Sequence, residues 1–143
     1  PLYRNDWRRP TEKVYTCTAP DQPGPWARGF IFGAAVAFKL GLPFVPIRKK
    51  GKLPGKVLRQ KYSLEYGNDE IQIHSNAITS RDRVLIIDDL IATGGTAVAS
   101  AKLISKCKVK NIEFYFIIDL KNVGGSQKLG KKFKLSSILE AEG

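Results

Sequence analysis

The sequence of 143 residues has little cysteine and histidine, with Cys17, Cys107 and His74 as its only residues of these two types. Two cysteines do not make a disulfide framework, and free thiols in a reducing cytoplasm are the simpler interpretation. Their spacing is not that of metal ligands, and one histidine does not complete a zinc site. We therefore expect neither a disulfide-stapled fold nor a structural zinc domain.

Long apolar runs are also missing. No stretch approaches the roughly 20 apolar residues that span a membrane, and residues 1–10 lack the apolar core of a signal peptide. With 43% hydrophobic and 26% charged residues, the composition is that of an ordinary globular chain. We expect a single cytoplasmic domain over residues 1–143 with no membrane partner.

Acidic residues are scarce, because 13 Asp and Glu stand against 24 Lys and Arg and leave a formal net charge of +11. The segment from Arg48 to Lys61 is strongly basic and contains no acid, and a second basic cluster lies between Lys128 and Lys134. This excess predicts an anionic partner such as nucleic acid or a phosphorylated metabolite. A solvated basic surface explains the charge alone equally well.

The apolar segments follow one another in an α/β order. The expected strands cover residues 14–18, 44–47, 62–66, 70–74, 83–88, 112–118 and 133–138, and the expected helices cover residues 29–40, 96–104 and 123–129. Residues 67–69 (Gly-Asn-Asp) predict a hairpin turn. Two apolar strands separated by a helix predict a parallel pair, and such sheets bind ligands at the carboxyl ends of their strands.

The run VLIIDDLIATGGT, from Val84 to Thr96, carries the most chemical information. Asp88 and Asp89 end an apolar strand, so their carboxylates point to opposite faces and need partners. Paired acceptors of this kind suit the two neighbouring hydroxyls of a ribose.

The glycines of the same run predict a phosphate site. Gly94 and Gly95 let successive backbone N–H groups curl inward, Thr93 and Thr96 add hydroxyl donors, and Thr96 is placed to N-cap the helix that follows. The positive end of that helix favours an anion at the same point. An ordinary strand-to-helix turn is the alternative, but it leaves the paired acids unexplained. The run is neither a Walker loop nor a dinucleotide fingerprint.

This run resembles the ribose-5-phosphate signature of the type I phosphoribosyltransferases. Three further blocks, ARGF (27–30), IRKKGKLPG (47–55) and YSLEYG (62–67), are similar to the adenine phosphoribosyltransferases in particular. The resemblance covers residues 27–140. It implies a central parallel sheet flanked by helices, with a β-hairpin flexible loop. Residues 1–26 are atypical, so we expect the hood that usually helps enclose the base to be shortened or altered.

The resemblance implies a pentosyltransferase of purine salvage. Such an enzyme transfers the 5-phosphoribosyl group from phosphoribosyl pyrophosphate to adenine and gives AMP and pyrophosphate. It implies a Mg²⁺ cofactor that is held mainly through the substrate, and a contribution of Asp88 to binding the ion stays open. It also implies a homodimer and no nucleic-acid partner.

The resemblance also implies a role for each matching residue. The catalytic residues are Glu65, Asp88 and Asp89. The ribose 5-phosphate is bound by Asp88, Asp89, Ala92, Thr93, Gly94, Gly95 and Thr96; the pyrophosphate by Arg28, Arg48 and Lys52; and the base by Tyr66 and Leu120. A carboxylate at the position of Glu65 suits proton removal from the attacking purine. Residues 52–66 have the composition of a mobile loop that closes over the site.

Two alternatives stay open. One is a regulator that binds phosphoribosyl pyrophosphate with the same fold but without catalysis, and the retained Glu65, Asp88 and Asp89 argue against it. The other is a basic RNA-binding module, which lacks clustered aromatic residues for stacking bases.

Overall fold

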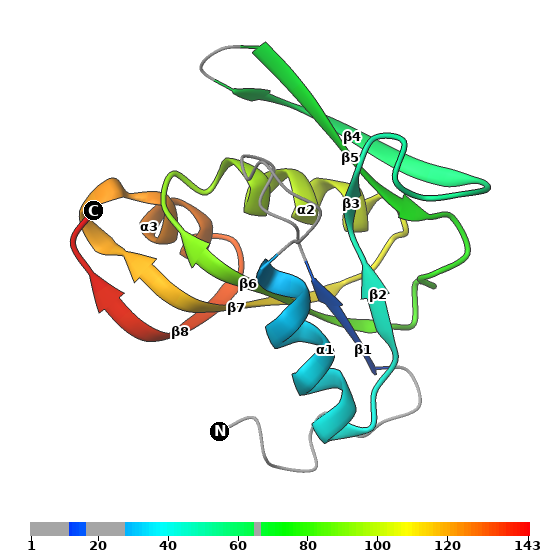
Figure 1. The fold of residues 1–143 in the computed structure, drawn as a ribbon, viewed down its shortest axis with the longest axis horizontal. Helices are drawn as coiled ribbons and strands as arrows, with labels where there is room; N and C mark the ends of the chain where they lie inside the picture. Colours follow the sequence, from blue (N-terminus) through cyan, green and yellow to red (C-terminus); the bar gives the residue numbers. More distant parts are fainter. Residues whose placement is uncertain (1–11, 17–27, 65–66) are drawn as a thin grey trace.

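The computed structural model of the chain describes residues 12–16, 28–64 and 67–143 (Figure 1). The predicted roles of Glu65 and Tyr66 lie outside these residues, as does most of the atypical segment 1–26. Among the helices of the described residues, none is long and apolar enough to cross a membrane.

A five-stranded parallel sheet with the order β2-β1-β6-β7-β8 forms the centre of the fold. Its strands are β1 (Glu12–Thr16), β2 (Phe44–Pro46), β6 (Arg83–Ile91), β7 (Asn111–Leu120) and β8 (Lys134–Ala141). The apolar residues that begin β6 are buried whichever face they point to, as expected of a central strand covered on both sides. The predicted parallel pair with a helical connection is therefore confirmed by β6 and β7.

Helices cover both faces of this sheet (Figure 1). Helix α1 (Arg28–Leu40) packs its buried residues Ala37 and Leu40 against Leu85 and Ile87 of β6. It ends before Gly41, whose φ of +66° is the left-handed conformation that stops helices. Helix α2 (Gly95–Ser105) lies on the opposite face.

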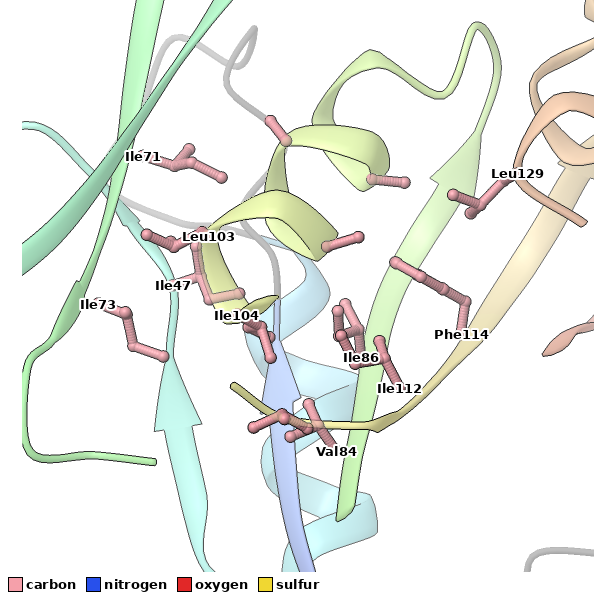
Figure 2. Packing of buried hydrophobic residues seen from close by; sticks show 14 of the residues in the cluster. Ile47, Ile71, Ile73, Val84, Ile86, Leu103, Ile104, Ile112, Phe114 and Leu129 are labelled. Carbon is pink, nitrogen blue, oxygen red and sulfur yellow. The ribbon is translucent and has the colours of Figure 1, made fainter. Parts of the chain in front are cut away.

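A smaller antiparallel sheet lies beyond α2 and has the order β3-β5-β4. Its strands are β3 (Arg48–Lys49), β4 (Val57–Leu64) and β5 (Gly67–His74). Figure 2 shows Leu103 and Ile104 of α2 between Ile71 and Ile73 of β5 and Ile86 of β6. One hydrophobic core therefore joins both sheets through α2.

The predicted hairpin was wrong in its turn and in the start of its first strand. Gly67 belongs to β5 and pairs with Leu64, so the connection lies at residues 65–66 and not at 67–69. Strand β4 begins at Val57, five residues before the expected start. The reason is that its basic residues alternate with inward ones, such as Leu58, which packs against the core.

The C-terminal part ends the sheet. The expected helix over 123–129 divides into a 3₁₀ helix, η2 (Lys121–Val123), and a short α-helix, α3 (Gly125–Gly130). The predicted last edge strand corresponds to β8, which pairs with β7 at the end of the sheet.

Candidate functional site

A cavity of about 130 Å³ lies at the carboxyl end of β6, where the strand gives way to α2. Its wall is formed by Asp88, Leu90, Ile91, Ala92, Thr93, Gly94, Gly95, Thr96, Ala97 and Phe116. The structure therefore brings Asp88 together with all five residues of the segment 92–96, here called the 92–96 loop. This grouping is the one expected for a phosphate beside a ribose.

The N-terminus of α2 opens into this cavity. The expected N-cap by Thr96 is wrong, because the helix starts at Gly95 and the N-cap residue is Gly94, with a φ of +82°. Gly94 adopts this left-handed conformation without strain and offers no side chain to the helix N–H groups. The donors that a serine or threonine cap would occupy are thus available to an anion, which the helix dipole also favours.

A second glycine, which sequence reasoning missed, supports the 92–96 loop from behind. The N–H of Gly125 donates to the carbonyl oxygen of Ala92 at 2.9 Å. A Cβ added to Gly125 would lie 2.2 Å from that oxygen and 2.7 Å from the nitrogen of Gly94. Only glycine permits this approach of α3 to the loop. The Gly124-Gly125 pair after a buried strand was the one available sequence signal.

The two carboxylates diverge as predicted, although β6 continues to Ile91, three residues beyond its expected end. Asp88 is 5% exposed and lines the cavity on the α2 side. Asp89 turns toward α1, where its Oδ2 lies 3.0 Å from Nε of Arg28. Oδ1 of Asp88 accepts a hydrogen bond from the backbone N–H of Asp89 at 2.9 Å.

Burial raises the pKa of Asp88 well above its ordinary value, because desolvation disfavours the charged carboxylate. The hydrogen bond from the Asp89 N–H opposes this effect, as does the positive charge of Arg28, while the Asp89 carboxylate reinforces it. A cation or a hydroxyl donor in the cavity would stabilise the ionised form. The Asp88 carboxyl is thus placed to contact a ligand that brings a positive charge or a hydroxyl donor into the cavity.

Of the other predicted side chains that the structure describes, Arg48, Lys52 and Leu120 are not among the residues that line this cavity. Arg48 in β3 places its guanidinium carbon 5.5 Å from the centre of the Phe30 ring, in a cation–π contact with α1. Lys52 is exposed in the turn after β3. Leu120 is half-buried at the end of β7, at the same edge of the sheet as Ile91. Their ligand contacts stay predictions.

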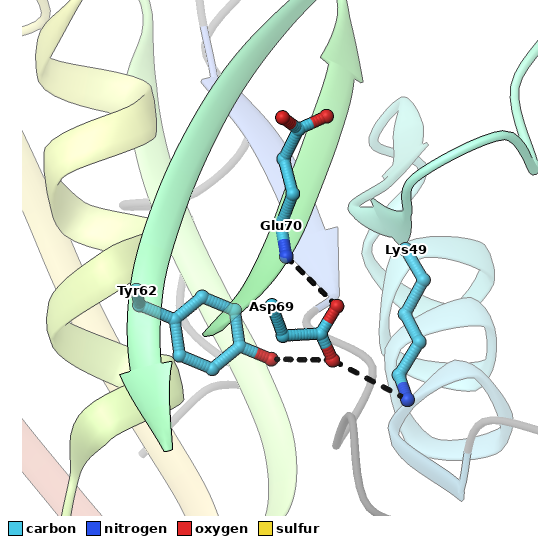
Figure 3. A network of polar contacts seen from close by, with 4 residues as sticks. All are labelled: Lys49, Tyr62, Asp69 and Glu70. Atoms are coloured by element: carbon cyan, nitrogen blue, oxygen red, sulfur yellow. Dashed lines mark hydrogen bonds and ion pairs between the residues drawn. The ribbon is translucent and has the colours of Figure 1, made fainter. Parts of the chain in front are cut away.

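A polar network holds the strands next to the connection that contains Glu65 and Tyr66. Oδ2 of Asp69 accepts a hydrogen bond from Tyr62 at 3.4 Å and lies 3.5 Å from Nζ of Lys49 (Figure 3). Its Oδ1 accepts the backbone N–H of Glu70 at 2.8 Å. The network joins all three strands of the smaller sheet, so the hairpin is fixed on both sides of residues 65–66.

The phosphoribosyl transferase domain family matches residues 24–141 of the chain. The adenine phosphoribosyltransferase of Campylobacter curvus is 60% identical over 116 residues, which make up 80% of this chain and 64% of that protein. The chain therefore spans slightly less than two thirds of the length of this curated relative.

Solved structures give the same match. The adenine phosphoribosyltransferase of Thermoanaerobacter pseudethanolicus has a TM-score of 0.82 at 38% identity, over 95% of this chain and 73% of that one. The adenine phosphoribosyltransferase of Saccharomyces cerevisiae, solved with an imino-altritol bisphosphate and adenine, has a TM-score of 0.76 at 37% identity, over 89% and 68%. The predicted fold class, a parallel sheet flanked by helices, is confirmed.

Proposed function

The chain belongs to the phosphoribosyl transferase domain family, and we propose that it transfers the 5-phosphoribosyl group of phosphoribosyl pyrophosphate to adenine. The products are AMP and pyrophosphate. The observation that carries this proposal is the cavity at the start of α2, because it combines an uncapped helix N-terminus with the buried carboxyl of Asp88. The similarity to adenine phosphoribosyltransferases supports adenine as the acceptor.

In this proposal the 92–96 loop binds the 5-phosphate. Its backbone N–H groups and the hydroxyls of Thr93 and Thr96 donate hydrogen bonds to the phosphate, which lies at the N-terminus of α2. The ribose then lies back toward Asp88 and Asp89, whose carboxylates accept its two hydroxyl groups. Departure of pyrophosphate leaves positive charge on the sugar ring, and the same carboxylates stabilise that charge.

Basic residues serve the leaving group. Arg28 stands at the N-terminus of α1 next to Asp89, and its side chain is 56% exposed and open to a ligand. We assign the pyrophosphate to Arg28, with Arg48 and Lys52 of the neighbouring basic segment as further partners. Bidentate hydrogen bonds from arginine suit the oxygens of a diphosphate.

The residues present fit a Mg²⁺ ion that is held mainly by the substrate. In the parts of the chain that the structure describes, no group of three or more His, Cys, Asp or Glu could hold a metal. Mg²⁺ is commonly held by one or two carboxylates together with substrate phosphates, and Asp88 offers one such carboxylate. When bound, the ion supplies positive charge beside the pyrophosphate.

The base is assigned to the hairpin and the end of β7. Glu65 accepts the proton that the purine loses on attack, and Tyr66 and Leu120 pack beside the base. A closed site keeps water from the reactive sugar, and the β4–β5 hairpin is the element that carries Glu65 toward it. The polar network around Asp69 supports a hairpin that moves as a unit.

Exposed apolar side chains on α1 and β2 support a homodimer. Ile31 is 67% exposed and Phe38 is 89% exposed on α1, with Phe44 of β2 at 37%. Apolar side chains gathered on one helix are typical of a surface that a partner covers. Sedimentation of the wild-type chain tests this assignment, since a monomer at micromolar concentration would contradict it.

The proposal is tested by incubating the protein with Mg²⁺, phosphoribosyl pyrophosphate and, in separate reactions, adenine, hypoxanthine and guanine. We expect nucleotide formation with adenine alone. Turnover of hypoxanthine or guanine in place of adenine would contradict the assigned base. Saturable binding of phosphoribosyl pyrophosphate without any product would support the regulator instead.

A further inference from the structure

A second cavity, of about 490 Å³, lies between α2, α3 and β4, and is formed by other residues than those of the 92–96 loop. Its size is that of small-molecule sites. Val98 and Ala101 of α2 and Leu129 of α3 give it an apolar floor, completed by Phe133. The Phe133 ring meets Phe114 edge-on with centroids 5.5 Å apart, so the floor is anchored in the core.

Four lysines surround this floor. Lys102 and Lys106 come from α2 and the turn after it, and Lys128 and Lys132 from α3 and the turn after it. Each pair is spaced by four residues, a spacing at which like charges repel on a helix. The helix C-termini offset part of this repulsion. Among the described residues that line the cavity there is no carboxylate to offset the rest.

One of these lysines is already held at the wall of the cavity. Nζ of Lys106 donates a hydrogen bond to the backbone carbonyl oxygen of Arg59 in β4. That acceptor is neutral, whereas an ionised phosphate or carboxylate makes a stronger and shorter bond with an ammonium group. When an anion enters the cavity, Lys106 therefore gains a stronger hydrogen-bond acceptor than the carbonyl oxygen of Arg59.

We propose that this cavity binds an organic polyanion with a flat apolar body, the chemistry of a nucleoside di- or triphosphate. The base packs on Phe133 and Leu129, and the phosphates meet the four ammonium groups. An inorganic anion would leave the apolar floor uncovered, and an uncharged ligand would bring no negative charge to the four ammonium groups. The site is independent of the transfer reaction proposed above, because it shares no lining residue with the 92–96 cavity.

The test is calorimetric titration of ATP into the full chain and its variants at physiological salt. K128A/K132A should weaken ATP binding at least about tenfold, because two charge-assisted contacts are lost. K110A/K131A is the matched control, since it removes the same charge from exposed lysines outside the cavity and should leave the affinity unchanged. K102A, on the opposite wall, should also weaken binding, which keeps the test valid if the double variant misfolds.

Three results would overturn the proposal. One is the absence of ATP binding to the wild-type chain at millimolar concentration. Another is an equal loss in K128A/K132A and K110A/K131A, which would indicate general attraction to a basic surface. The third is a loss confined to a variant that displaces the 92–96 loop, such as G125A in α3, which would place ATP in the other cavity.

Discussion

Arg28 and Asp89 form an ion pair, with Nε of Arg28 lying 3.0 Å from Oδ2 of Asp89. The pair links the first residue of α1 to the last part of β6. It joins a residue assigned to the pyrophosphate with one assigned to the ribose. The bond between the ribose and the pyrophosphate of the substrate is therefore expected to lie near this pair.

Replacement of Arg28 tests that relationship. In R28A we expect the affinity for phosphoribosyl pyrophosphate to fall about 10- to 100-fold, because a charge-assisted contact to the leaving group is lost. The KM for adenine should change little. K39A removes the same charge from the last turn of the same helix and serves as the control. Similar losses in R28A and K39A would show that net charge alone matters.

Asp88 gives a prediction in which stability and activity change in opposite directions. Because burial raises the pKa of Asp88, the folded state binds more protons than the unfolded state above about pH 4, and stability falls as the pH rises. Asp88→Asn should remove that loss and make the free protein more stable than the wild type at pH 8. Near pH 4 the two proteins should be equally stable.

Thermal unfolding across this pH range measures the effect of Asp88→Asn. Turnover should fall in the same variant, because the amide carries no charge for the sugar or the ion. A variant that is less stable than the wild type at pH 8 would contradict the unfavourable burial of this carboxyl.

Gly125 tests the support behind the 92–96 loop. In G125A the new methyl group would lie 2.2 Å from the oxygen of Ala92, so the loop must shift. A misplacement of about 1 Å can cost about 100-fold, and we expect a loss of up to that size as a higher KM for phosphoribosyl pyrophosphate. The control is G130A, because no atom lies within 4 Å of a Cβ added there. Unchanged substrate affinity in a folded G125A would disprove the role.

Replacement of Glu65 tests the chemical step separately from substrate binding. Glu65→Gln keeps the shape of the side chain but cannot take up the purine proton, so turnover should fall by about 100-fold or more. Binding of phosphoribosyl pyrophosphate should weaken far less, as measured by calorimetry without adenine. Equal losses in turnover and in binding would contradict the role assigned to Glu65.

The sequence allowed the central sheet and the 92–96 loop to be predicted because both depend on local signals. The apolar run of β6 indicates burial on both faces, and the glycines after it indicate a turn with free N–H groups. The start of β4 was missed because basic residues mask its alternation. The cap of α2 was missed because Thr96 is a good N-cap residue while Gly94 adopts a left-handed φ.

Contacts between distant segments could not be predicted in this way. The approach of Gly125 to Ala92 depends on how α3 packs against the end of β6, and no local pattern encodes a separation of that kind. The same holds for the four lysines around the second cavity, which come from two helices separated by β7. The sequence indicated two basic clusters, but it did not indicate that lysines from separate segments lie around one cavity.

The most direct measurement is the stoichiometry of products from adenine, phosphoribosyl pyrophosphate and Mg²⁺ with the wild-type chain. Transfer of the phosphoribosyl group predicts AMP and pyrophosphate in equal amounts, with adenine consumed to the same extent. Release of pyrophosphate without AMP, or the absence of both products while phosphoribosyl pyrophosphate stays bound, would contradict the account.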